Sequence, residues 1–252
     1  MSELLLQSIE TTDVEALVTG VNLIWVFVAT VLVFFMHAGF GMLESGQVRS
    51  KNVANQLTKN VLTWGVGIIS YFVIGVAVSG IIAAITSGSA IGNVFTHLSN
   101  DFSATSWPGI LFAGAFSMVA ASIVSGAVAE RAQLKGYITY TDFAGATVVH
   151  MVGGVCGLVA AYIIGPRRGK FDDDGSSNVI PGHSLPYAVL GTLILAFGWY
   201  GFNIGTAINV FDPAAASEGS IELADYAYAG RVAINTALIM GAGSVGAAAV
   251  GL

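Results

Sequence analysis

The stretch NLIWVFVATVLVFFMHAGFGML, residues 22–43, contains no Asp, Glu, Lys or Arg. It is longer than the roughly 20 apolar residues that cross about 30 Å of hydrocarbon as an α-helix. Lipid offers no hydrogen-bond partners to backbone N–H and C=O groups, so such a run must be helical to satisfy its own backbone. The stretch therefore predicts a membrane-spanning helix.

The rest of the chain repeats this pattern. Charged residues make up 10% of the 252 residues, against about a quarter in soluble domains. Further uncharged runs cover residues 60–86, 102–129, 143–166, 184–211 and 232–252. The sequence thus predicts an all-α, polytopic membrane helical bundle of about six spans. We expect one membrane domain over residues 1–252, multi-pass in the cell membrane.

Eight of the nine basic residues lie near one set of connections, and the ninth, Arg231, starts the last run. Those near the ends of the first, third and fourth runs are Arg49, Lys51, Lys59, Arg131, Lys135, Arg167, Arg168 and Lys170. The segment before the first run and the loops 87–101 and 212–225 contain acids but no Lys or Arg. Because basic loops favour the cytoplasm, this asymmetry predicts an N-terminus outside the cell.

This assignment raises a topological conflict around residues 132–141. Basic clusters precede and follow the single uncharged run 143–166, and both read as cytoplasmic. The chain from Lys135 to Asp142 extends to about 25 Å at most, too short to cross a membrane. Three explanations stay open: one cluster lies outside, the run is re-entrant, or a spanning helix that belongs before Asp142 is missing.

Asp142 and His150 are ionisable residues in this region, eight positions apart. On a helix they lie about 80° from each other, so both could face one side of a bundle. Ionisable groups inside a span are costly and tend to mark a substrate or proton path. A structural role is the alternative for each, as a helix N-cap for Asp142 and as a hydrogen-bond donor to a carbonyl for His150.

Two aromatic patterns suggest a cation site. Trp199, Phe202 and Thr206 follow each other at i, i+3 and i+7, and Phe112 and Phe116 are four residues apart. Aromatic ring faces attract ammonium-like cations, and a hydroxyl accepts a hydrogen bond. Each pattern alone is more often packing than a binding site.

Other features of the spans are expected to be structural. The pairs Gly153/Gly157 and Gly201/Gly205 have the GxxxG spacing that lets helices approach closely. His37 and Cys156 are expected to pack. Glu44 and Glu130, at the ends of spans, are interpreted as caps or ion-pair partners.

Several functional classes find no support in the sequence. It contains no metal-ligand or nucleophile motif, so we expect neither an enzyme nor a metal or cofactor site. The formal net charge of −6 argues against nucleic acid as a partner.

Four motifs together resemble the Amt/Rh ammonium transporter family. They are GFGMLESGQVRSKN (residues 39–52), GAVAER (126–131), DFAGATVVHMVGG (142–154) and GWYGFNIGTA (198–207). The resemblance extends from the first run to the end of the chain. It implies ammonium or ammonia transport for nitrogen uptake, through a hydrophobic pore or channel.

The resemblance also implies roles for individual residues. Phe116 and Phe202 match the stacked pair that gates the pore, and Phe112, Phe116 and Thr206 match the outer site that holds ammonium. His150 matches the first of two pore histidines. A further match, Asp142, is the acid that supports the outer vestibule.

The family has eleven spans with an inverted internal repeat, assembles as homotrimers, and binds cytoplasmic PII signalling proteins in many cases. This chain departs from that pattern in two places. The family has a further span where the chain has only residues 132–141, and the chain ends near the family's seventh span, before the second pore histidine. It is therefore identified as a truncated, internally shortened member. The alternative to transport is a non-conducting ammonium-sensing or assembly module.

Overall fold

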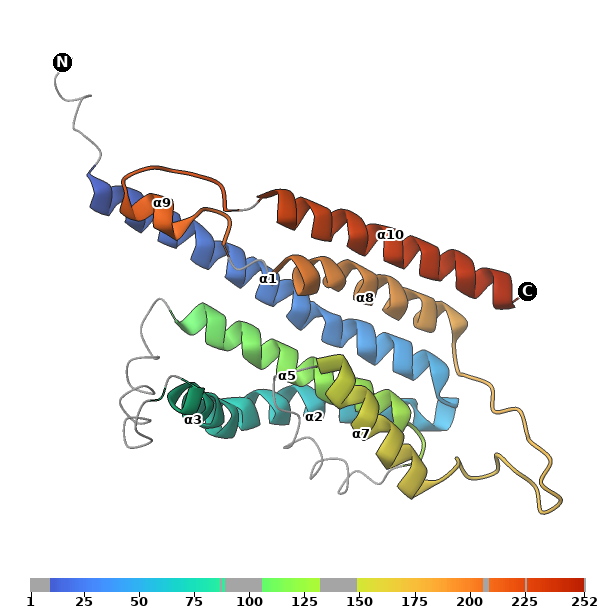
Figure 1. Cartoon of the computed structure of the whole chain (residues 1–252). Helices are drawn as coiled ribbons and strands as arrows, with labels where there is room; N and C mark the ends of the chain where they lie inside the picture. Colours follow the sequence, from blue (N-terminus) through green and yellow to red (C-terminus); the bar gives the residue numbers. More distant parts are fainter. Residues whose placement is uncertain are drawn as a thin grey trace. The chain divides into compact units, whose positions relative to one another are not determined.

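The computed structural model describes residues 10–86, 88, 106–131, 149–205, 209–224 and 226–251. These residues are mostly helical and the described ranges contain no strand beyond two isolated bridges, which confirms the all-α prediction (Figure 1). In chain order the elements are α1 (Thr11–Gln47), the 3₁₀ turn η2 (Ser50–Asn52), α2 (Val53–Ser70), the π-turn η3 (Tyr71–Gly75), α3 (Val76–Thr86), α5 (Trp107–Ala127), α7 (Val149–Ile164), α8 (Leu185–Gly205), α9 (Pro213–Ser217) and α10 (Tyr226–Gly251).

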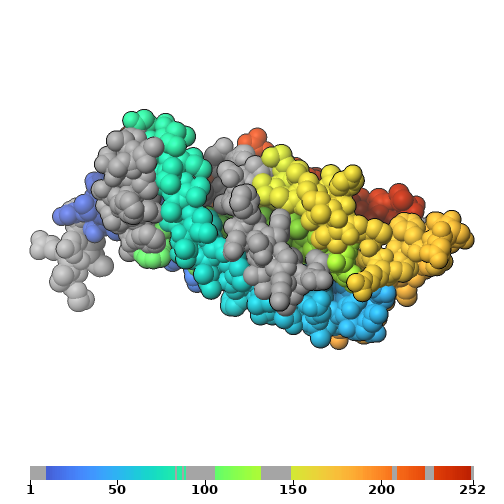
Figure 2. All heavy atoms as spheres, turned by 90° about the horizontal axis from the view of Figure 1, so that it is seen from below, coloured from blue at the N-terminus to red at the C-terminus, as the bar shows by residue number. Residues whose placement is uncertain are grey.

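The helices match the predicted membrane spans. Among the described residues, five helical segments are long and apolar enough to cross a membrane: Thr11–Gln47, Ser50–Thr86, Trp107–Ala127, Leu185–Gly205 and Gly230–Val250. A shorter apolar helix, α7, falls within the predicted run 143–166. Figure 2 shows α7, in yellow, at the surface of the molecule, and its Tyr162 and Ile163 side chains are 87% and 76% exposed. Outward apolar side chains of this kind suit contact with acyl chains.

The chain divides into two compact units. Unit 1 comprises Met1–Leu32 and Trp199–Leu252, and unit 2 comprises Val33–Gly198.

In unit 2, glycines bring α1 and α8 into backbone contact. A Cβ added to Gly39 would lie 2.9 Å from Leu195 Cγ, and one added to Gly46 would lie 2.6 Å from the carbonyl oxygen of Ser184. Gly191 lies against the backbone nitrogen of Leu43. Because lipid supplies no hydrophobic drive between helices, such close approach is what holds the pair together.

The helices α5 and α7 pack through Gly153 and Gly157. A Cβ on Gly153 would lie 2.9 Å from Ile123 Cβ, and one on Gly157 would lie 3.1 Å from Ala127 Cβ. Moving from Gly153 to Gly157 along α7 thus moves the contact from Ile123 to Ala127 along α5, so the two helices run parallel. The close approach predicted from this GxxxG pair is confirmed. Cys156 packs against Val124 and Val128, also as predicted.

A polar cluster joins the ends of these parallel helices. We call Arg49, Asn52, Glu130 and Arg167 the Glu130 cluster. Arg49 Nε lies 3.1 Å from Glu130 Oε1, and Arg167 Nη1 lies 3.2 Å from Glu130 Oε2. The described basic residues Arg131 and Arg167, which precede and follow α7, therefore lie at one end of unit 2. The side of the membrane on which each cluster lies stays a prediction.

In unit 1, a loop is tied to α1 through Asn22. Its Oδ1 accepts hydrogen bonds from the backbone N–H groups of Val210 and Phe211, at 2.7 and 3.0 Å, and its Nδ2 donates to the Phe211 carbonyl at 3.0 Å. Gly201 of α8 packs on Leu32 of α1, which agrees with close approach at the second GxxxG pair.

Candidate functional site

The predicted aromatic pair of α5 forms a ring contact in unit 2. The ring centroids of Phe112 and Phe116 are 4.5 Å apart, with the planes tilted by 55°. At 100° per residue, Phe116 continues into the stripe of Ala120, Ile123 and Ala127 on one face of α5. The part of this stripe from Ala120 to Ala127 is the surface that α7 covers.

The same packing places His150 beside the level of Phe116. Gly153 lies against Ala120, so one helical turn earlier on each of these parallel helices brings Val149 to the level of Phe116. Val149 is 6% exposed, and His150 follows it on the first turn of α7 with an exposed side chain. The structure thus brings Phe112, Phe116 and His150 to the same end of one helix pair.

The second aromatic pair lies in unit 1. The ring centroids of Trp199 and Phe202 are 4.8 Å apart, and Phe202 is 8% exposed. Phe116 and Phe202 belong to different units, so their stacking stays a prediction. Two further predicted site residues, Asp142 and Thr206, lie outside the described residues.

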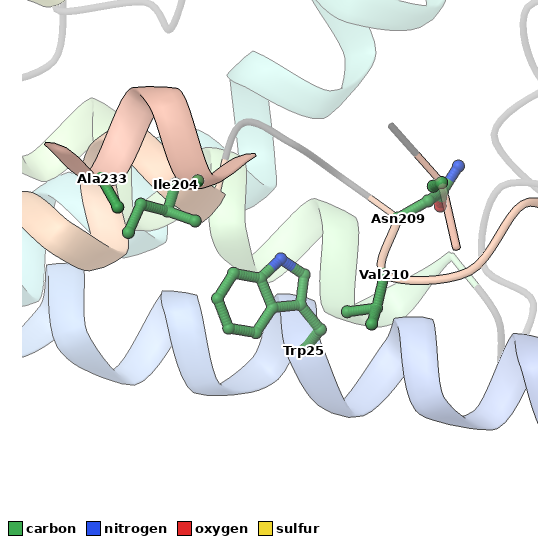
Figure 3. A pocket seen from close by; sticks show the side chains of 7 residues that line it. Trp25, Ile204, Asn209, Val210 and Ala233 are labelled. Atoms are coloured by element: carbon green, nitrogen blue, oxygen red, sulfur yellow. The ribbon is translucent and has the colours of Figure 1, made fainter. Parts of the chain in front are cut away.

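A cavity in unit 1 adjoins the end of α8. It has a volume of about 210 Å³ and is lined by Trp25, Ile204, Asn209, Val210, Ala224, Gly230 and Ala233. Figure 3 shows the Trp25 indole between Ile204 on one side and Val210 on the other. The sequence alone does not mark Trp25 as a site residue, because an aromatic residue in an apolar run carries no signal of its own.

A buried charged group lies where α1, α2 and α5 meet. Glu44 is 3% exposed, and its Oε2 accepts hydrogen bonds from Gln56 Nε2, Asn60 Nδ2 at 2.9 Å and Ser125 Oγ at 2.8 Å. Lys59, 5% exposed, donates from Nζ to the Ser125 carbonyl at 3.0 Å. The sequence predicted a cap or ion-pair partner for Glu44. It did not reveal the converging amides, because Gln56 and Asn60 carry no charge.

His37 lies seven residues before Glu44 on α1, about two helical turns away, and also faces α5. Its Nδ1 is 3.3 Å from Ser122 Oγ, and its ring contacts those of Phe34 and Phe40 at centroid distances of 6.2 and 6.4 Å. Its Nε2 is buried and has no hydrogen-bond partner within the described part of the chain. The predicted packing role of His37 accounts for its ring contacts.

The Glu130 carboxylate is held as an anion. Burial alone would raise its pKa, but hydrogen bonds from Asn52 and from the backbone and side chain of Arg49 outweigh burial, and the pKa is lowered from its ordinary value. The prediction of an ion-pair partner is confirmed for Glu130. In the described ranges, no group of three or more His, Cys, Asp or Glu side chains is placed to hold a metal ion.

The helices and their apolar outer faces define a multi-pass α-helical membrane protein. The model of the Ammonium Transporter Family matches residues 24–141 and 138–251. The chain belongs to this family.

Relatives and solved structures agree with this assignment. The ammonium transporters Amt2 and Amt1 of Haloferax mediterranei are 53% and 44% identical to the chain, in each case over 94% of it, and the alignments cover 58% and 52% of those proteins. A solved structure named Sensor Amt Protein superposes with a TM-score of 0.67 at 29% identity, covering 78% of the chain and 57% of that protein. Saccharomyces cerevisiae Mep2 gives a TM-score of 0.57 at 25% identity, over 75% and 49%. The chain spans about half the length of the relatives it matches.

The comparisons also mark an internal discontinuity. The two matched segments of the family model meet at residues 138–141. The alignment with Haloferax Amt2 runs over 269 positions but includes only 94% of the 252 residues of this chain. Roughly 30 positions of the alignment therefore lack a residue in this chain. This number is about the length of one spanning helix with its connection.

Proposed function

We propose that this chain is an ammonium transporter subunit, or part of one, that moves ammonium or ammonia across the cell membrane. The observation that carries the proposal is the Phe112–Phe116 ring pair, 4.5 Å apart, on the α5 face that leads to α7 and His150. Family membership supports the same substrate.

The physical sequence of events follows from these residue types. Phe112, Phe116 and the hydroxyl of Thr206 would hold ammonium at the outer mouth through ring faces and a hydrogen bond. Beyond the gate of Phe116 and Phe202, an apolar passage disfavours a bare cation, so ammonium gives up its proton and ammonia continues. His150 would then bond ammonia or relay the proton with its two nitrogens.

Two further residues have supporting roles in this proposal. Asp142 would attract the cation to the outer mouth and fix the start of the helix that carries His150. Trp199, whose ring contacts Phe202 at 4.8 Å, would fix the orientation of the gate.

The topology and assembly are part of the same proposal. The two units would form one membrane domain with an extracellular N-terminus, and a spanning helix of the family would be missing between Arg131 and Asp142. The parallel course of α5 and α7 supports the missing helix, because two successive spans that run in the same direction need a further crossing between them. We also propose a homotrimer and a cytoplasmic PII signalling protein as partner, both on the family resemblance.

A second candidate is a non-conducting ammonium sensor or assembly module. The similarity to the protein named Sensor Amt Protein favours it. The two candidates differ in one observable, because a sensor binds ammonium without moving it.

Binding of labelled methylammonium to the purified chain in lipid nanodiscs tests the recruitment site. Phe116→Leu removes one ring face of the pair and should weaken binding about tenfold. Phe171→Leu is the control, because Phe171 is an exposed aromatic residue in the loop 165–184. Equal losses in the two variants, or none in Phe116→Leu, would contradict the proposed site.

A further inference from the structure

The two oxygens of the Glu44 carboxylate have different surroundings. Oε2 is surrounded by three neutral donors, from Gln56, Asn60 and Ser125. Oε1 accepts no hydrogen bond from the described residues, and it lies beside Gly126. Gly126 is exposed, and a Cβ added there would lie 3.4 Å from Oε1. Gly126 therefore places no side-chain atom beside Oε1.

The charges around Glu44 are few and can be assigned to their helices. On α2, Lys59 is the facing cation, and its Nζ is held by the Ser125 carbonyl at 3.0 Å. On α5, the facing residues Ser125 and Gly126 carry no charge. Burying a carboxylate and an ammonium group in a span is costly, and such groups tend to mark ion or substrate pathways.

We propose that Glu44 Oε1 is a second binding site for a small ammonium-class cation, at the end of α1 and α5 that carries the basic clusters. The free lone pairs of Oε1 accept N–H bonds from the cation, while Oε2 stays anchored to the three neutral donors. This site deepens the proposed function and rests on it, because ammonium is the cation that the chain would carry.

Lys59 limits the affinity of the site for a cation. Its positive charge beside Glu44 repels a second cation, so binding is weak and release is fast. A site near the exit of a transport path needs this property, since conduction requires that binding be loose enough for the ion to leave.

The site is separate from the aromatic one. Ser125 follows Phe116 by nine residues, which at 100° per residue places it on the opposite side of α5. The distance along the helix is about 13 Å at 1.5 Å per residue. A variant of Phe116 therefore leaves the surroundings of Glu44 in place.

The test is equilibrium binding of labelled methylammonium to the full chain in nanodiscs, with Phe116→Leu as the background that weakens the outer site. Glu44→Gln keeps the shape of the side chain and should lower the remaining affinity at least tenfold. Lys59→Met removes the competing charge and should raise that affinity several-fold. Gly126→Val covers Oε1 without removing a charge and should abolish the binding that depends on Glu44.

Opposite effects of the two charge variants separate a cation site from a structural ion pair. If the pair only stabilises the fold, Glu44→Gln and Lys59→Met both lower the unfolding temperature and neither changes affinity, and the proposal is wrong. If Glu44→Gln fails to fold, Gly126→Val decides, and unchanged affinity in that variant overturns the site. Binding that depends on Glu44 but not on Phe116 would reject the aromatic recruitment site while keeping this one.

Discussion

Arg167 Nη1 lies 3.2 Å from Glu130 Oε2, so the segments that follow α7 and α5 meet at one end of unit 2. Arg131, next to Glu130, also reaches this region, where its Nη1 donates to the Gly165 carbonyl at 3.2 Å. Two basic clusters that are separated by one apolar run in the sequence are thus neighbours in space. The parallel course of α5 and α7 brings the C-terminal ends of both helices to this end of unit 2.

Removing the Glu130 charge should destabilise unit 2. Glu130→Gln leaves Arg49 and Arg167 without their anionic partner, and hydrogen bonds to charged groups contribute about 1.5–3 kcal/mol each. We expect the free energy of unfolding to fall by about 2–3 kcal/mol, measured by chemical unfolding in detergent. Asp174→Asn is the control, because Asp174 binds Ser176 within an exposed loop. Similar losses in both variants would contradict the role of the Glu130 cluster.

The lowered pKa of Glu130 predicts a pH dependence with a definite sign. The unfolded chain protonates Glu at a pKa of about 4.3, and the folded chain does so at a lower pH. The stabilisation that the ionised Glu130 carboxylate gives the folded chain is therefore complete above about pH 4.3. It is lost as the pH falls through the pKa of Glu130 in the folded chain. The unfolding temperature of the wild type should drop more steeply than that of Glu130→Gln between about pH 5 and 3. Parallel curves would contradict this assignment.

Gly153 and Gly154 offer a matched pair on α7. Gly153→Ala places a Cβ 2.9 Å from Ile123 Cβ and 3.0 Å from the Ala120 carbonyl oxygen, so it should cost about 1–3 kcal/mol by overpacking. A Cβ on Gly154 meets nothing within 4 Å, so Gly154→Ala should be neutral or stabilise the helix by up to about 1 kcal/mol. Thermal unfolding of the two variants in the same detergent checks this ranking, and the reverse order would refute the α5–α7 packing.

Asn22→Ala should release the loop 209–224 from α1. The variant removes one acceptor and one donor, so the N–H groups of Val210 and Phe211 lose their partner, at a cost of about 1–3 kcal/mol. Limited proteolysis should cut this loop several times faster than in the wild type. Glu218→Gln is the control in the same loop, because the Glu218 side chain is exposed. Unchanged cleavage in Asn22→Ala would show that other contacts hold the loop.

The sequence predicted the features that depend on patterns within one segment. Uncharged runs indicated the spans, and the spacing of Gly153 and Gly157 indicated close helix packing. The Phe112–Phe116 contact also followed from spacing, because residues four apart meet on a helix.

Features that depend on several segments were beyond the sequence. The hydrogen bonds of Glu44 come from α2 and α5, and no single-segment pattern shows that Gln56 and Ser125 converge on it. The ion pair between Glu130 and Arg167 likewise depends on the parallel course of α5 and α7, whereas the charges alone left the side of the membrane open. Trp25 became a cavity residue through its neighbours from α8 and α10.

Uptake of ammonium by liposomes that contain the purified chain tests the central claim most directly. The account predicts ammonium-dependent alkalinisation or acidification of the lumen above that of empty liposomes, and a loss of at least tenfold in His150→Ala. His183→Ala, which changes an exposed histidine in the loop 165–184, should transport like the wild type. Equal rates in wild type and His150→Ala would contradict the account, and so would uptake no faster than in empty liposomes.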